Sequence, residues 1–368
     1  AIGYLALEDY EDGDGNGHNT AVGARSQREA TTGEFNTSLG SLSMGVGVTT
    51  GNGNVAVGYN TGADITSGAE NTFIGKNAGA NTTSGNYNEA IGSGALFTNV
   101  DGSRNVAIGT NALYTLDPAS AVDMYNIGIG MYAGRYITTG IQNTIIGGLA
   151  GDALTTGAGN VAIGYEALTT QIVGGRNVAV GSQALKNQNV SANANNTAVG
   201  YQAGLNVTTG VQNTLVGSLA GDALTTGVNN VAIGYNSLST EDAHGGNTAI
   251  GHGSLFLLNA GADGFNTALG FEAGKGMTTG VQNTSVGALA LDATVTGNFN
   301  VAVGMSAGGA VTSGHSNTII GNSAGDALTT GDNNIIIGKD AAASAVDVSS
   351  TTVIGTTATT SALVHGLK

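Results

Sequence analysis

The chain has 368 residues, of which 63 are glycine, one is proline and none is cysteine or tryptophan. High glycine without proline or a three-residue period excludes collagen, and 40% apolar residues argue against disorder. A net charge of −15 disfavours nucleic acid and anionic membranes as partners, and the absence of cysteine excludes disulfides and zinc thiolates. Since no apolar run reaches the roughly 18–20 residues of a membrane span, we expect no membrane insertion.

Residues 1–18 are predicted to form a partial first coil with an acidic insertion. Within it, Asp12, Asp14 and Asn16 have the spacing that opens a calcium-binding loop. The twelfth position of that pattern is Gly23 rather than the usual bidentate glutamate. Calcium is therefore a candidate ligand of Asp12, Asp14 and Asn16, and a solvated acidic insertion is the alternative. No other cofactor is expected.

Residues 19–355 repeat one five-residue phrase, typically Asn-(Thr/Val)-(Ala/Ile)-(Val/Ile)-Gly. Of the nineteen spacings between successive phrases from Asn19 to Thr351, fifteen are the same 17-residue step, and the others are 18, 21, 19 and 19. A fixed period of this length is typical of solenoids. The β-branched residues of the phrase favour strand, and no segment has a sustained helical period. We therefore predict an all-β, parallel β-solenoid of about twenty 17-residue coils, nearly without helix.

Within a coil, the fourth phrase residue is always Val, Ile or Leu, so we assign it to the interior. A Thr-Thr-Gly or Thr-Ser-Gly sequence precedes many phrases and predicts a tight turn. Because stacked coils place like residues over like, the phrase asparagines should form a ladder of side-chain amides. The residues expected in this structural ladder include Asn54, Asn71, Asn88, Asn105, Asn143, Asn213, Asn230, Asn283 and Asn317.

Longer coils recur through most of the chain at every fourth position. The coils that begin at Asn36, Asn105, Asn177 and Asn247 exceed the 17-residue step, and Gln142, Gln212 and Gln282 recur at the same four-coil interval. Extra residues in a solenoid form loops on one edge. The sequence therefore predicts a row of protrusions, one for every four coils.

Four tyrosines follow the phrase glycine in their coils: Tyr59, Tyr165, Tyr201 and Tyr235. Aligned aromatic rings can contact the sugar rings of a cell-surface glycan or receptor. The alternative, which we favour, is that they cover a seam between coils or subunits.

The sequence offers no grounds for catalysis. The five histidines are far apart, no nucleophile elbow occurs, and the periodic glycines lack the Lys-Ser/Thr of a phosphate loop. We expect a protein that is not an enzyme.

A 17-residue coil is thin, and association with other copies would give it a second buried face. We therefore expect a homotrimer. Residues 356–368 differ from the repeat and are predicted to form a C-terminal exit segment. The chain begins inside a phrase, which makes end-to-end stacking into an extracellular filament the alternative to a discrete fibre. An ice-binding face is disfavoured, because the Thr-Thr-Gly columns fall at turns.

Several phrases resemble those of known surface proteins, among them Asn196-Thr-Ala-Val-Gly-Tyr-Gln-Ala-Gly204 and Asn230-Val-Ala-Ile-Gly-Tyr-Asn-Ser-Leu238. They are similar to the head repeats of YadA-like trimeric autotransporter adhesins and to the longer repeats of bacteriophage tail-fibre proteins. The resemblance implies a left-handed parallel β-roll, a trimer, an extracellular or virion-surface location, and a structural role in host or surface attachment. The 17-residue period is longer than that of the adhesin heads.

Overall fold

The computed structural model describes residues 1–10 and 17–356 and divides into two units, residues 1–194 and 195–368. Each unit is a parallel β-solenoid, and together they contain about 20 turns of about 17 residues. The described residues contain strands and turns but no helix, so the predicted all-β solenoid is confirmed. Nor do they include a helix with the length and apolar character required to cross a bilayer. The predicted exit segment lies outside the described residues from position 357 onward.

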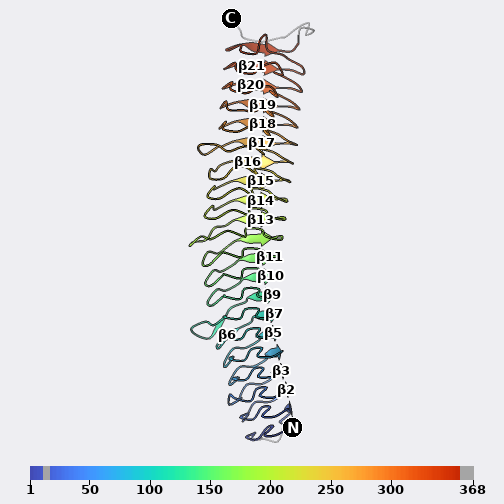
Figure 1. Ribbon diagram of the computed structural model, residues 1–368, viewed down its shortest axis with the longest axis vertical. Helices are drawn as coiled ribbons and strands as arrows, with labels where there is room; N and C mark the ends of the chain where they lie inside the picture. Colours follow the sequence, from blue (N-terminus) through green and yellow to red (C-terminus); the bar gives the residue numbers. More distant parts are fainter. Residues whose placement is uncertain (11–16, 357–368) are drawn as a thin grey trace, which may run out of the picture. The chain divides into compact units, whose positions relative to one another are not determined.

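The strands of the first unit are short, and each turn contributes one of them to the main sheet (Figure 1). These strands are β1 (Thr20–Val22), β2 (Thr37–Leu39), β3 (Val55–Val57), β4 (Thr72–Ile74), β5 (Glu89–Ile91), β7 (Val106–Ile108), β9 (Ile127–Ile129), β10 (Thr144–Ile146), β11 (Val161–Ile163) and β12 (Val178–Val180). A separate two-stranded pairing joins β6 (Gly102–Ser103) to β8 (Val122–Asp123).

The second unit repeats this arrangement. Its strands are β13 (Thr197–Val199), β14 (Thr214–Val216), β15 (Val231–Ile233), β16 (Thr248–Ile250), β17 (Thr267–Leu269), β18 (Thr284–Val286), β19 (Val301–Val303), β20 (Thr318–Ile320), β21 (Ile335–Ile337) and β22 (Thr352–Ile354).

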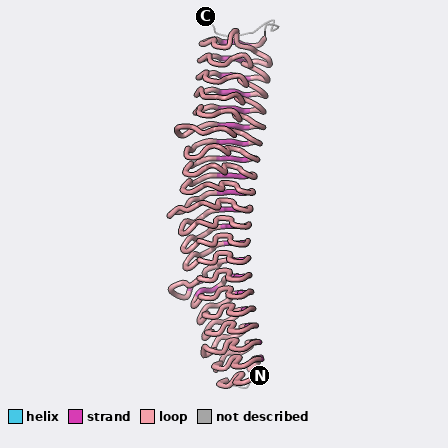
Figure 2. The backbone as a smooth tube through the Cα atoms, viewed as in Figure 1, coloured by secondary structure: helices cyan, strands magenta, loops and turns pink. Residues whose placement is uncertain are grey.

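Successive strands within each unit pair in parallel, with like positions of the repeat side by side. In the second unit Thr214 lies beside Val231, and Val231 lies beside Thr248. Figure 2 shows the short strands of each unit in line, joined by longer turns without regular structure. The register predicted from the 17-residue spacing is therefore confirmed.

The glycine that ends each phrase is required by the close approach of the next turn. Gly217 has φ +136°, and a Cβ built on it would lie 2.5 Å from the carbonyl oxygen of Gly234. An L side chain would meet both an unfavourable backbone conformation and a collision with the backbone. The stack can close at this corner only with glycine.

The inward residue of each strand is the third of the phrase rather than the fourth. Ala232 and Leu215, at the middle of their strands, are completely buried, and the same holds for Phe73 and Ala90 in the first unit. The fourth residue points outward, as Ile74 and Ile91 show, with 39% and 38% of their surfaces exposed. Our assignment of the fourth position to the interior was wrong. Alternate residues of a strand point to opposite faces, and the inward position holds mostly alanine, with a larger side chain such as Leu215 or Phe73 in some turns.

The phrase asparagines form a buried column inside each unit. The side-chain oxygen of Asn54 accepts hydrogen bonds from the backbone N–H and the side-chain amide of Asn71, both 3.0 Å long. The Asn71 amide also donates to the carbonyl oxygen of Gly85, at 2.9 Å, in the turn that closes its own coil. Comparable bonds join Asn88, Asn105, Asn143, Asn213, Asn230, Asn283 and Asn317 to the neighbouring asparagines. Each amide therefore ties one turn to the next and also closes its own turn.

Candidate interaction surfaces

The outward face of the sheet is an uncovered apolar surface in each unit. Its two side-chain columns come from the first and third residue of each strand, because alternate residues of a strand share a face. The first column is mostly threonine and valine, and the second consists entirely of valine, isoleucine and leucine. Leu269 is 45% exposed and Ile320 is 38% exposed. We call these two columns the strand face.

The strand face differs from the rest of the chain in its charge. Although the chain carries a net charge of −15, Glu89 is the only charged residue among the outward positions of the described main-sheet strands. Its neighbours in the same column are Thr72 and Val106. An apolar surface this regular and this free of charge is unusual for a face left in water.

In each unit, the residues that follow the phrase glycines form a column at one edge of the strand face, and some of them are aromatic. Tyr59, Tyr165, Tyr201 and Tyr235 follow the phrase glycine and are 48–53% exposed, so their rings are open to solvent in the single chain. Phe271 extends the column and is 53% exposed. Whether a glycan or another copy of the chain covers these rings stays a prediction.

In each unit, a second column with aromatic members lies at the other edge, immediately before the phrase asparagines, and sequence reasoning missed it. Its rings are 52–57% exposed and belong to Phe35, Tyr87, Tyr125, Phe265 and Phe299. These residues have φ between +47° and +63°, a left-handed conformation that is uncommon for aromatic residues. The signal was present in the sequence as a ring directly before the asparagine, but polar residues occupy the same place in other coils.

Part of this column in the first unit is organised by an arginine. The Arg104 guanidinium lies 4.8 Å from the ring centroid of Tyr87 and 5.9 Å from that of Tyr125. Its Nε is 2.9 Å from Asp123 Oδ2 on β8. The hydrogen bond and the negative charge of Asp123 raise the pKa of Arg104. Because all these groups are exposed, this cluster orders a surface but adds little stability.

The long turns protrude, as predicted, and two of them are fixed by a buried polar side chain from the turn before. The loop near β6 and the loop between β16 and β17 extend beyond their neighbours (Figure 1). In the first unit, Gln171 donates to the carbonyl oxygen of Val190 at 2.8 Å. In the second unit, Glu241 accepts from the backbone N–H of Ala260 at 3.1 Å. Both side chains are completely buried.

Glu241 also belongs to a group that resembles a metal site. One potential ligand atom from each of Glu241, Asp242 and His244 lies within 4.8 Å of the others. However, Glu241 Oε1 is 3.0 Å from His244 Nδ1 and accepts from the His244 backbone N–H at 3.1 Å. Its other oxygen accepts from Ala260. These bonds explain the buried carboxylate as an anchor for the loop without any metal ion.

Three aspartates at equivalent places carry a partly buried carboxyl group: Asp152, Asp222 and Asp292. Burial raises the pKa of each one above its usual value. For Asp152 the charge of Arg135, at 3.7 Å, lowers the pKa in part. For Asp222 a hydrogen bond with Ser239 lowers the pKa in part. Since these three aspartates lie in different coils and face separate turns, no two of them form a pair that could work as acid and base.

The predicted calcium ligands Asp12, Asp14 and Asn16 lie outside the described residues. Two of the histidines stack on neighbouring rings. His18 lies 5.2 Å from Phe35, and His252 lies between Tyr235 and Phe271.

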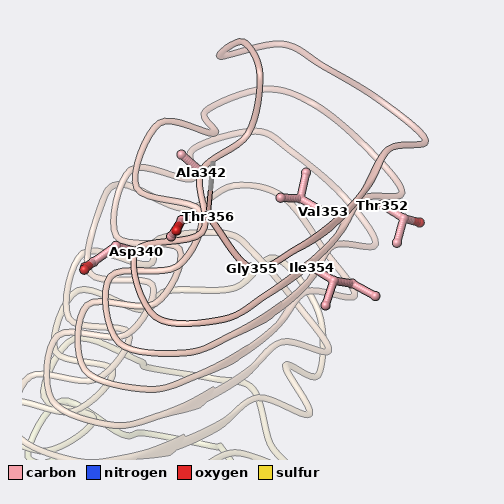
Figure 3. A pocket seen from close by; sticks show the side chains of 7 residues that line it. All are labelled: Asp340, Ala342, Thr352, Val353, Ile354, Gly355 and Thr356. Carbon is pink, nitrogen blue, oxygen red and sulfur yellow. The ribbon is translucent and has the colours of Figure 1, made fainter. Parts of the chain in front are cut away.

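Described residues of the second unit line a cavity at β22 and another beside Gly253. The larger, about 450 Å³, opens over β22 and is lined by Asp340, Ala342 and residues 352–356 (Figure 3). Val353 is the inward residue of β22, yet it is only half-buried, in contrast to the inward residues of the other main-sheet strands. The smaller cavity, about 170 Å³, lies beside Gly253 between charged and aromatic side chains.

No protein-family model matches the chain, and no curated protein matches its sequence. The resemblance to adhesin heads and tail fibres therefore stays a prediction.

Proposed function

We propose that the chain is a structural segment of a trimeric fibre that mediates attachment to a host cell or another surface. One observation carries the proposal: the strand face is apolar and almost free of charge throughout both units. A location outside the cell or on a virion surface is part of the proposal. The thin coil and the resemblance to trimeric adhesins and tail fibres favour three copies.

A second copy is the partner that fits the strand face best. Its aliphatic side chains repeat once per turn, about 4.8 Å apart, so a partner with the same repeat can match it turn by turn. The net charge of −15 makes other surfaces of two copies repel one another, whereas contact through the nearly uncharged strand face avoids that repulsion. Covering a half-exposed valine or isoleucine contributes about 0.5–1.5 kcal/mol. Summed over many turns, this contribution is large compared with the cost of association, about 4–15 kcal/mol.

The aromatic columns supply the attachment part of the proposal. They flank the strand face, so association through that face leaves their outer edges available to a glycan or receptor. Rings such as Tyr201 and Tyr235 combine an apolar surface with a hydroxyl, a combination suited to sugar recognition.

Sedimentation equilibrium of the full chain tests the proposal. A mass three times that of one chain, constant on dilution into the micromolar range, is the expected result. A stable monomer at the same concentrations would rule out the trimeric fibre.

An alternative proposal is a subunit of an extracellular filament. Its support is the open surface of β22, where Val353 is half-buried and a cavity of about 450 Å³ remains (Figure 3). In a filament, a turn of another copy would add a strand in parallel to β22. Electron micrographs would then show particles that lengthen with protein concentration, whereas particles of one fixed length would exclude this alternative.

A further inference from the structure

One side-chain column of the second unit is interrupted by a glycine. The column is formed by the residue two places after each phrase glycine, in the order Leu219, Asn236, Gly253, Glu272 and Leu289. At Gly253 the missing side chain leaves a cavity of about 170 Å³. Its lining consists of Asn236, His252, Gly253, Phe256, Glu272 and Lys275. We call this cavity the Gly253 notch.

The notch stays open because a salt bridge holds the residue above it. Lys275 Nζ lies 2.9 Å from Glu272 Oε1, and a Cβ added to Gly253 would meet the nearest atom, Glu272 Cγ, at 3.5 Å. The equivalent glycine of the first unit, Gly94, has no such room. A Cβ there would collide with the side-chain oxygen of Asn111, which fills the space. The open notch is therefore a feature of these particular residues and not of every glycine in the column.

Aromatic rings form one wall of the notch. The ring centroid of His252 lies 5.4 Å from that of Tyr235 and 5.1 Å from that of Phe271, and both pairs are stacked. With both faces covered by these rings, the His252 ring is held in place beside the cavity that it lines. Phe256 adds an aromatic ring to the lining. The face of an aromatic ring is a surface on which the C–H groups of a ring-shaped ligand can pack.

Polar groups occupy the remaining sides. The Glu272 side chain is 19% exposed and offers acceptors, while the Lys275 side chain is 43% exposed and offers donors. Asn236 carries both a donor and an acceptor in its amide. Glutamate and lysine cancel each other's charge, which removes any preference for an ionic ligand. A neutral molecule with hydroxyl groups on its rim and C–H groups on its face matches this set.

We propose that the Gly253 notch binds one neutral pyranose ring of a surface polysaccharide. Adjacent sugar hydroxyls donate to the Glu272 carboxylate and accept from Lys275 and Asn236, while the sugar C–H groups pack on the ring of Phe256. The proposal deepens the attachment role proposed above, on which it rests, by giving the class of partner and its place.

A substitution that fills the notch tests the proposal. Gly253→Asn should be tolerated, because Asn236 occupies the same column with φ +53° and Gly253 has φ +60°. Ser306→Asn is the matched control, since Ser306 lies in the same column with φ +54°. Saturation-transfer NMR titrations would use the methyl pyranosides of glucose, galactose, mannose and N-acetylglucosamine as probes. Glu272→Gln is a second variant, which removes the charge but keeps a side chain of the same length whose oxygen can still accept from Lys275.

At least one methyl pyranoside should bind the unmodified chain with a Kd of about 1–10 mM, as expected for a single sugar ring. Gly253→Asn should weaken this binding at least tenfold and Glu272→Gln several-fold, whereas Ser306→Asn should leave it unchanged. Absence of binding by all four probes, or equal binding by Gly253→Asn, would overturn the proposal. The mass of the same samples by sedimentation separates this outcome from a failure of the trimeric fibre, because the notch lies within one chain.

Discussion

The side-chain oxygen of Asn300 accepts two hydrogen bonds from Asn317, one from its backbone N–H and one from its side-chain amide, each 3.0 Å long. The same Asn317 amide donates to the carbonyl oxygen of Gly331 at 2.9 Å. One buried side chain thus satisfies acceptors in two turns. Because an unpaired buried polar group is costly, this column ties the fold together at every turn.

Replacement of Asn317 by aspartate should strongly destabilise the second unit. The carboxylate cannot donate to Gly331, whose carbonyl oxygen loses this partner, and it places a buried negative charge beside the Asn300 oxygen, which still accepts from the backbone N–H. The loss should cost about 2–4 kcal/mol. Hydrogen exchange of the surrounding turns measures the loss locally, which suits a repeat protein. Asn333→Asp, at an exposed position, carries the same chemical change and should have little effect. Equal protection in the two variants would contradict a structural role for the column.

Leu269→Lys should disrupt the proposed oligomer while leaving the fold of the single chain intact. Leu269 lies on the strand face with 45% of its surface exposed, and a charge there would be buried between copies. Leu257→Lys is the matched control, because Leu257 is 42% exposed but lies in a turn. Sedimentation should find the first variant dissociated and the second assembled. Assembly of both variants would exclude the strand face as the interface.

The partly buried carboxyl of Asp222 predicts a dependence of stability on pH. Its pKa is raised in the folded chain, so the folded state binds the proton more tightly than the unfolded state does. Stability should therefore increase as the pH falls from above the raised pKa towards the ordinary value. Asp222→Asn should raise the denaturant concentration at the midpoint of unfolding at pH 7. This gain should disappear in acid, where the Asp222 carboxyl is protonated and no longer opposes folding. The exposed Asp340→Asn controls for net charge, and an equal gain from it would refute the assignment.

The loop anchored by Glu241 should accept glutamine but not alanine. Gln171 occupies the equivalent place in the first unit and bonds to Val190 through its amide. Glu241→Gln should keep a bond to the Ala260 backbone, whereas Glu241→Ala leaves buried groups unpaired at a cost of about 1–3 kcal/mol. Hydrogen exchange at Ala260 should accelerate only in the alanine variant. Faster exchange in both would point to a specific need for the carboxylate.

The sequence predicted the solenoid, its parallel register and its protruding turns, because the 17-residue period and a glycine corner such as Gly217 leave few alternatives. It did not predict which side of the strand faces inward. Alternate residues of a strand face opposite sides, so each strand offers two candidate sets of inward residues. Ile91 is larger and more apolar than its neighbour Ala90 and therefore looks more like a core residue. The structure reverses this expectation, because the inward residue is Ala90, and most turns hold alanine there although some hold a larger residue such as Phe73.

The Gly253 notch could not be predicted from the sequence for a related reason. Whether a glycine leaves a space depends on the residue that lies over it in the next coil. Over Gly253 this residue is Glu272, which is held by Lys275, whereas over Gly94 it is Asn111, whose side-chain oxygen fills the space. The second aromatic column was also missed, since Phe265 and Phe299 share their place with polar residues in other coils.

The most direct test of the central claim is the reactivity of single cysteines towards a maleimide, in a chain that has no cysteine of its own. Ile250→Cys, on the strand face, should be protected in the assembled protein and should react rapidly once Leu269→Lys has dissociated the copies. Ala249→Cys, which replaces a completely buried residue, should be protected in both states. Two results would contradict the account. One is rapid reaction of Ala249→Cys together with protection of Ile250→Cys in the dissociated chain, and the other is equal reactivity of Ile250→Cys in the assembled and the dissociated protein.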